Sequence, residues 1–72
     1  MSKYNGKSFG QILREKRKER GWSQRQLGGL IKIPQQTITA WETGINEPML
    51  YSAILLADVF ECTIDELVGR TM

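Results

Sequence analysis

The sequence predicts an all-α protein: a compact bundle of five short helices, in which the second and third helices form a helix-turn-helix. Three observations support this prediction. A chain of 72 residues has room for one domain with one modest core. Its apolar residues recur at steps of three and four, which is typical of amphipathic helices. Glycine, proline and capping serine or threonine separate these apolar segments and mark where helices begin and end.

The first helix is predicted over residues 9–20. Ser8 is a suitable N-cap, and Gly21 can take the left-handed conformation that closes a helix. Phe9, Ile12 and Leu13 form its apolar stripe. The polar residues 1–8 before it are expected to form a flexible arm, so the helical domain itself covers residues 9–69.

The second helix is expected to start at Gln24. Ser23 and Gln26 form a capping box, in which the serine hydroxyl and the glutamine side chain each bond to the other residue's backbone amide. Gly28 and Gly29 lie inside this helix, where each costs about 1 kcal/mol relative to alanine. We interpret Gly28 as the point where the next helix crosses closely, and Gly29 as a solvent-facing position.

The third helix begins after a break from Lys32 to Pro34. Proline lacks an amide hydrogen, so Pro34 fits the first turn of a new helix better than the interior of an old one. This helix is expected to stop at Gly44. The apolar positions around the break are Leu27, Leu30, Ile31, Ile33, Ile38 and Trp41. Two short helices joined by such a break predict a helix-turn-helix.

The fourth helix, residues 49–60, is apolar on nearly every side. Its expected core stripe is Leu50, Ala53, Ile54, Ala57 and Phe60. Leu55 and Val59 then remain as surplus apolar surface, which suggests a partner. A second capping box, Thr63 with Glu66, opens a short fifth helix that ends near Gly69, and residues 70–72 form a tail.

Composition argues against several classes of protein. The only cysteine is Cys62, so no internal disulfide can form, and the chain has no histidine, the commonest metal ligand and acid-base catalyst. No nucleophile, base and orienting residue form a recognisable set. We therefore expect no enzymatic activity, no metal and no cofactor. No apolar run is long enough to cross a membrane or act as a signal peptide, which predicts a cytoplasmic protein without a membrane partner.

Charge is divided unevenly along the chain. Residues 1–40 carry nine Lys or Arg and two Glu, a net +7, whereas residues 41–72 carry one Arg and six acidic residues, a net −5. The first half could therefore face a polyanion while the second half faces elsewhere. A solvated basic surface without a partner explains the same pattern, so charge alone does not decide between the two interpretations.

From residue 9 to residue 68 the chain resembles the lambdoid phage repressors and Cro proteins, also called Xre-type helix-turn-helix regulators. The matching positions are Arg17, Gly21, Ser23, Gln24, Leu27, Ile33, Thr37, Ile38, Trp41, Glu42, Gly44, Pro48, Leu50, Ala57, Asp65, Glu66 and Leu67. The resemblance implies a lambda-repressor-like fold, double-stranded DNA as the ligand and a homodimer on a palindromic operator. It also implies a structural ion pair between Arg17 and Glu42.

Two groups of residues are candidates for DNA contact. The candidates for base reading open the third helix and are Gln35, Gln36, Thr37, Thr39 and Ala40. A glutamine amide can donate to and accept from adenine, although exposed glutamines can also be simple helix formers. The phosphate candidates are Gln24, Ser23, Arg25, Lys32, Arg14, Thr43 and Asn46. Gln24 leads them because free amides and the dipole at a helix N-terminus favour anions.

Two positions depart from the pattern of the family. Lys32 stands where the family prefers glycine, so it is expected to take a positive φ. Pro34 replaces the usual serine or threonine cap of the third helix, and a hydrogen bond typically worth about 1 kcal/mol is lost.

The leading hypothesis is a sequence-specific transcriptional regulator, acting as a repressor, that inserts its third helix into the major groove of an operator as a homodimer. The dimer candidates are Leu55, Val59, Leu67, Val68 and Met72. The alternative is an antitoxin-like or adaptor module that binds a protein partner, with weak or secondary DNA binding. The acidic second half and the surplus apolar surface of the fourth helix favour this alternative.

Overall fold

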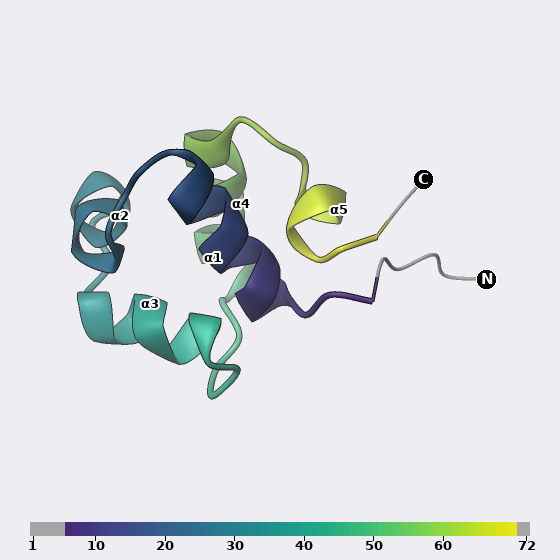
Figure 1. Ribbon diagram of the computed structural model, residues 1–72, viewed down its shortest axis with the longest axis horizontal. Coiled ribbons are helices and arrows are strands. Elements are labelled where there is room, and N and C mark those ends of the chain that lie inside the picture. The colour runs from purple at the N-terminus through teal and green to yellow at the C-terminus, as the bar shows by residue number, and fades with distance from the viewer. Residues whose placement is uncertain (1–5, 71–72) are drawn as a thin grey trace.

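The computed structural model describes residues 6–70, which form five α-helices joined by short turns (Figure 1). The helices are α1 (Phe9–Glu19), α2 (Gln24–Ile31), α3 (Gln35–Glu42), α4 (Leu50–Phe60) and α5 (Ile64–Leu67). The prediction of an all-α fold with five helices in this order is confirmed. Residues 1–5 of the expected arm and residues 71–72 of the expected tail lie outside the described residues. Within residues 6–70, no helix is long and apolar enough to cross a membrane.

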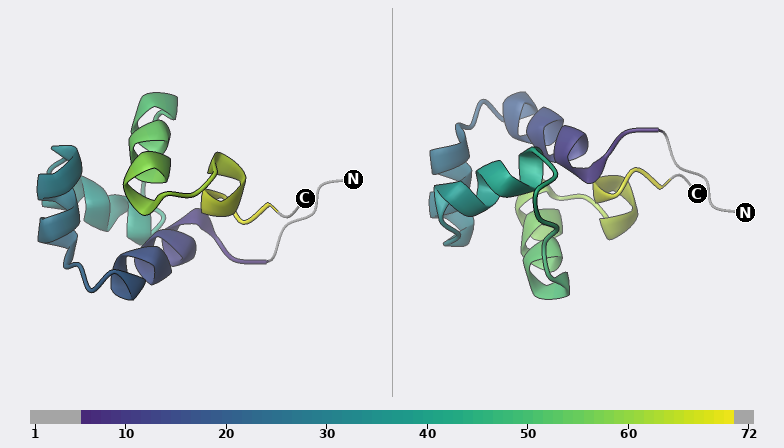
Figure 2. Two further views of the ribbon diagram at one scale, coloured as in Figure 1. Left: turned by 90° about the horizontal axis from the view of Figure 1, so that it is seen from above. Right: turned by 90° about the horizontal axis from the view of Figure 1, so that it is seen from below.

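The helices surround one core. α2 and α3 lie at one end of the long axis and α5 at the other, while α1 and α4 lie on opposite faces between them (Figures 1 and 2). Each helix contributes one completely buried side chain, and these are Leu13, Leu27, Ile38, Leu56 and Leu67. Because every helix inserts an apolar anchor, the position of α3 depends on the packing of the whole domain.

Capping explains where most helices begin. Ser8 and Gln11 form a capping box at α1, and Ser23 and Gln26 form the expected one at α2. Both arrangements satisfy amides that lack a partner within the helix. Ser8, the last residue of the expected arm, is the N-cap of α1 as predicted.

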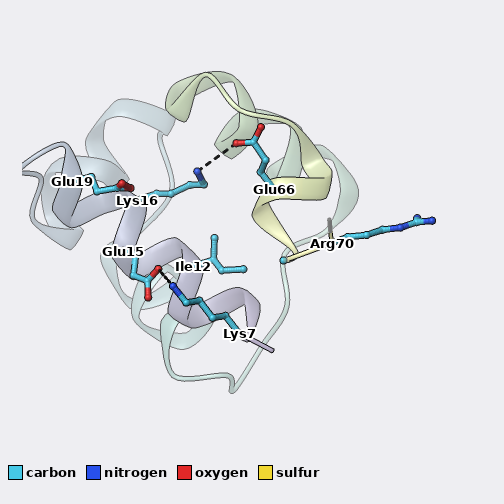
Figure 3. A pocket seen from close by; sticks show the side chains of 8 residues that line it. Lys7, Ile12, Glu15, Lys16, Glu19, Glu66 and Arg70 are labelled. Carbon is cyan, nitrogen blue, oxygen red and sulfur yellow. Dashed lines mark hydrogen bonds and ion pairs between the residues drawn. The ribbon is translucent and has the colours of Figure 1, made fainter. Parts of the chain in front are cut away.

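The second expected capping box, at α5, forms only in half. The Thr63 hydroxyl accepts a hydrogen bond from the Glu66 amide at 3.1 Å. The Glu66 carboxylate makes no return bond to Thr63 and lies 3.7 Å from the Lys16 ammonium across a cleft between α1 and α5 (Figure 3). Lys7 is paired on the same side of α1, with its ammonium 2.8 Å from Glu15 (Figure 3). The helix α5 therefore begins with a cap from Thr63 alone.

The turn between α2 and α3 differs from the prediction by one residue. Lys32 has φ 59° and ψ 44°, the positive φ expected there. Pro34, with φ −58° and ψ 145°, is the N-cap of α3 and makes no side-chain cap, as the comparison with the family pattern implied, and it precedes the first turn in which its lack of an amide hydrogen had placed it. Its extended ψ angle keeps it outside the helix.

Close approaches of the backbone explain two buried glycines. A Cβ atom on Gly28 would lie 2.5 Å from the carbonyl oxygen of Ile33, so the tight neighbour is the turn and not the crossing helix that we predicted. A Cβ atom on Gly10 would lie 2.5 Å from the carbonyl oxygen of Glu42 and 2.7 Å from that of Trp41. No local pattern in the sequence indicates this second contact, where the N-terminus of α1 meets the C-terminus of α3.

The predicted core stripe of α4 is confirmed near the end of the helix and wrong near its start. Ala57 and Phe60 are buried as predicted and Leu56 is buried as well, whereas Leu50 is 73% exposed and Ile54 is 43% exposed. A helix that is apolar on nearly every side has no unique inward face in its sequence. Its neighbours α2 and α5 decide which side is covered.

Candidate nucleic-acid interface

The outward face of α3 carries the residues expected to read bases. Ile38 and Trp41 are buried on the inner face, so the first turn presents Gln35 and Gln36 to solvent. Within residues 6–70, neither glutamine side chain has a hydrogen-bond partner. Thr37 and Ala40 lie beside them and are half-buried. Both amides are therefore free to donate and to accept toward a ligand.

A buried ion pair holds α3 against α1. Arg17 Nε lies 2.7 Å from Glu42 Oε2, and Arg17 Nη2 donates to Glu42 Oε1 at 3.0 Å. The two side chains are 10% and 4% exposed. A third bond, from Arg17 Nη1 to the carbonyl oxygen of Trp22 at 2.8 Å, reaches the loop before α2. The structure thus brings together the two residues for which the family resemblance implied a structural pair.

The surroundings of Glu42 favour its charged form. Burial by itself raises the pKa of the Glu42 carboxyl, but hydrogen bonds from Arg17 and Gln24 and the nearby charges of Arg17 and Arg14 outweigh it. The net result is a pKa below the usual value for glutamate. The hydrogen bond to Glu42 likewise raises the pKa of Arg17 despite its burial.

This lowered pKa predicts a loss of stability in acid. At a pH between the lowered pKa and the ordinary glutamate pKa, the unfolded chain binds a proton that the folded one does not. The stabilisation from Glu42 is therefore complete above about pH 5 and is lost as the pH falls through the folded pKa. We expect unfolding free energies measured from pH 7 to pH 3 to fall less steeply for the double variant Arg17→Met/Glu42→Leu, which leaves no unpaired buried charge, than for the parent. Parallel curves would contradict the assignment.

The side chain of Gln24 is held between α2 and α3. Its Nε2 donates to Glu42 Oε1 at 3.1 Å, and its Oε1 accepts from Thr39 Oγ1 at 2.7 Å. Thr39 Oγ1 also lies 3.1 Å from the carbonyl oxygen of Gln35. Thr39, which we expected to read bases, thus has its hydroxyl engaged within the protein.

The other phosphate candidates fall on two flanks of α3 and one separate site. Arg14 and Arg25 are exposed, and the positive charge of Arg14 helps to lower the pKa of Glu42, the carboxyl that Gln24 also contacts. Asn46 lines a hollow with Thr37 on the other flank. Lys32 lies apart from both, in a shallow groove beside α4.

Two candidate hydroxyls already have partners inside the protein. Ser23 accepts from the Gln26 amide at 3.0 Å as the cap of α2. The Thr43 hydroxyl donates to the carbonyl oxygen of Thr39, one helical turn earlier, at 2.9 Å.

Comparison with known proteins also identifies a helix-turn-helix in this chain. A family model described as helix-turn-helix matches residues 13–67, which is more than half of the chain. The chain belongs to the Xre-type helix-turn-helix family. This is a family of DNA-binding transcriptional regulators, a non-enzymatic class.

Relatives of this Xre-type domain include regulators of known structure. The HTH-type transcriptional regulator AnsR of Bacillus subtilis (strain 168) is 40% identical over 58 residues, which are 81% of this chain and 50% of that protein. The chain thus spans about half the length of this curated relative. The P22 c2 repressor in complex with a synthetic operator superimposes with a TM-score of 0.82 at 26% identity, covering 86% of this chain and 94% of the repressor. The restriction-modification controller protein C.AhdI of Aeromonas hydrophila has a TM-score of 0.76 at 32% identity, covering 82% and 89%.

The apolar surface of the Xre-type domain differs from the expected dimer surface. Leu67 is completely buried in the protomer core, so its place on a dimer surface was wrong. Leu55 and Val59 are half-buried, Val68 is 38% exposed, and Met72 lies outside the described residues. The larger exposed apolar side chains follow α3 and are Ile45, Met49, Leu50, Tyr51, Ile54 and Ile64. Of these, Leu50 and Ile54 were expected in the core.

Proposed function

We propose that this Xre-type domain is a sequence-specific DNA-binding transcriptional repressor that inserts α3 into the major groove. The observation that carries the proposal is the pair Gln35 and Gln36, exposed and without partners within residues 6–70, at the start of a helix anchored by its other face. Residues at the N-terminal end of a recognition helix are those that reach base edges. A glutamine amide matches the adjacent acceptor and donor of adenine, so each half-site should contain adenine.

Contacts to the DNA backbone would come from both sides of α3. Arg14 and Gln24 both act on Glu42 at the C-terminal end of α3, Arg25 is exposed next to Gln24 in the chain, and Asn46 lines a hollow with Thr37. Phosphate contacts position a protein on DNA without specifying sequence, and the basic residues make affinity dependent on salt. Support for DNA as the ligand also comes from the P22 c2 repressor, whose similar structure was determined in complex with an operator.

We propose further that the active form is a homodimer joined through the α4–α5 patch, which we define as Leu50, Ile54, Ile64 and Val68. Each of these side chains is at least 37% exposed, and Leu50, Ile64 and Val68 line one groove. Near a two-fold axis a residue lies close to its own copy, and like charges there repel each other. An uncharged patch therefore suits a two-fold interface better than the charged surface around the patch. Exposed apolar patches on a small domain commonly mark such contacts.

Selection from random duplexes tests base reading by α3. We expect the parent to enrich one motif, and Gln35→Ala or Gln36→Ala to relax it at one base pair. Each change should weaken operator binding by about 1 to 3 kcal/mol, or roughly 5- to 150-fold. Glu19→Ala, an exposed position on α1, serves as the control that keeps parental binding.

Two results would contradict the proposal. Base reading by α3 fails if no motif is enriched and both glutamine variants bind like the parent. The homodimer fails if sedimentation shows a monomer at concentrations well above the operator affinity. The α4–α5 patch also fits an adaptor role, which stoichiometric co-purification of a second protein together with negligible DNA affinity would favour.

A further inference from the structure

We propose that Thr39 is a positioning residue for the DNA backbone and not a base reader: its hydroxyl holds the Gln24 amide so that only a hydrogen-bond donor faces the DNA. This inference rests on the proposed function. It concerns a chain of polar contacts that joins α1, α2 and α3 through Arg17, Glu42, Gln24 and Thr39.

The orientation of the Gln24 amide follows from what its two neighbours can do. The Glu42 carboxylate is ionised and can only accept, so the Gln24 Nε2 end must face it, as the distance of 3.1 Å shows. Arg17 binds both carboxylate oxygens and keeps this acceptor in place. The amide oxygen of Gln24 is then turned toward Thr39, whose hydroxyl donates to it at 2.7 Å.

One hydrogen remains on Gln24 Nε2, and it has no acceptor within residues 6–70. Gln24 is also the first residue of α2, so its backbone amide lacks the partner that a preceding turn would supply. Phosphate oxygens only accept hydrogen bonds, and both remaining groups only donate. A reversed amide would present its oxygen to the phosphate and repel it.

The same contacts leave Thr39 without a hydrogen to donate to a base. A hydroxyl has one hydrogen, and that of Thr39 lies between Gln24 Oε1 and the carbonyl oxygen of Gln35. Thr39 thus links the predicted phosphate anchor on α2 to the turn of α3 that carries the glutamine pair. We expect the anchor and the base-reading turn to keep a constant spacing for this reason.

The experiment compares Thr39→Val, Thr39→Ser, Gln24→Ala and the double variant Thr39→Val/Gln24→Ala. Binding is measured to the selected operator and to an unrelated duplex at several salt concentrations. We expect Thr39→Val to weaken binding to both duplexes by about tenfold, the scale of one hydrogen bond to a charged group. The selected motif and the salt dependence should stay parental because no base contact and no charge is removed. Thr39→Ser should restore affinity, and Thr39→Val should add nothing when Gln24 is already alanine.

Ile12→Val is the stability control. It removes one methylene group from a buried side chain of α1 that belongs neither to the DNA-binding face nor to the α4–α5 patch. It should lower thermal stability and leave DNA affinity unchanged. This control separates positioning from a general loss of stability.

Different results overturn different claims. A changed motif in Thr39→Val would make Thr39 a base reader. Parental affinity in that variant, or an equal loss with and without Gln24, would also overturn the positioning role while the proposed function stands. If the parent itself binds no duplex at low salt, the proposed function fails first and the inference falls with it.

Discussion

Replacing Arg17 with methionine is expected to lower the free energy of unfolding by about 3 to 5 kcal/mol, because it leaves the Glu42 carboxylate buried without its partner. Glu42 is only 4% exposed, and Arg17 supplies two of its three hydrogen bonds within residues 6–70. A domain of this size has a total stability of only a few kcal/mol. The variant should therefore be largely unfolded at 25 °C. Urea titration followed by tryptophan fluorescence measures the difference.

A surface pair provides the comparison for this prediction. Lys7 and Glu15 lie 2.8 Å apart but are each about half exposed. Glu15→Gln should change stability by less than about 1 kcal/mol, as is usual for exposed pairs. Adding Glu42→Leu to Arg17→Met should recover part of the loss, since an apolar pair strands no charge. The role assigned to the buried pair is wrong if Arg17→Met costs no more than Glu15→Gln.

Alanine at two adjacent glycines is expected to change stability in opposite directions. A Cβ atom on Gly28 would lie 2.5 Å from the carbonyl oxygen of Ile33, whose own amide bonds to the Gly28 carbonyl oxygen at 2.9 Å. The Ile33 carbonyl oxygen belongs to the backbone and is held in place by this hydrogen bond, so it cannot move easily away from an added Cβ atom. Gly28→Ala should therefore cost about 1 to 3 kcal/mol. A Cβ atom on Gly29 would meet nothing within 4 Å. Gly29→Ala should therefore stabilise the protein by up to about 1 kcal/mol.

Thermal unfolding of the two variants, side by side with the parent, tests this prediction. Both substitutions add the same methyl group to the same helix, so helix propensity is matched between them. Equal shifts in Tm would show that helix propensity, and not the turn after α2, controls both positions.

The helix starts and stops could be predicted from the sequence because they depend on neighbouring residues. Ser23 and Gln26 are three residues apart and cap each other wherever the helix lies. Gly21 and Gly44, which follow α1 and α3, both have positive φ. The exposure of Gln35 and Gln36 also followed from local spacing, since Ile38 and Trp41 define the inner face of α3.

Tertiary packing alone decided the remaining features. The phase of α4, the burial of Leu67 and the close approach at Gly10 all depend on residues distant in the sequence. The bond that engages the Thr39 hydroxyl within the protein has the same origin, because its partner Gln24 lies fifteen positions earlier in the chain. Capping and periodicity act within one or two helical turns and are visible in the sequence. Which apolar side is covered, and which polar atom is already bonded, depends on contacts between helices that no local pattern specifies.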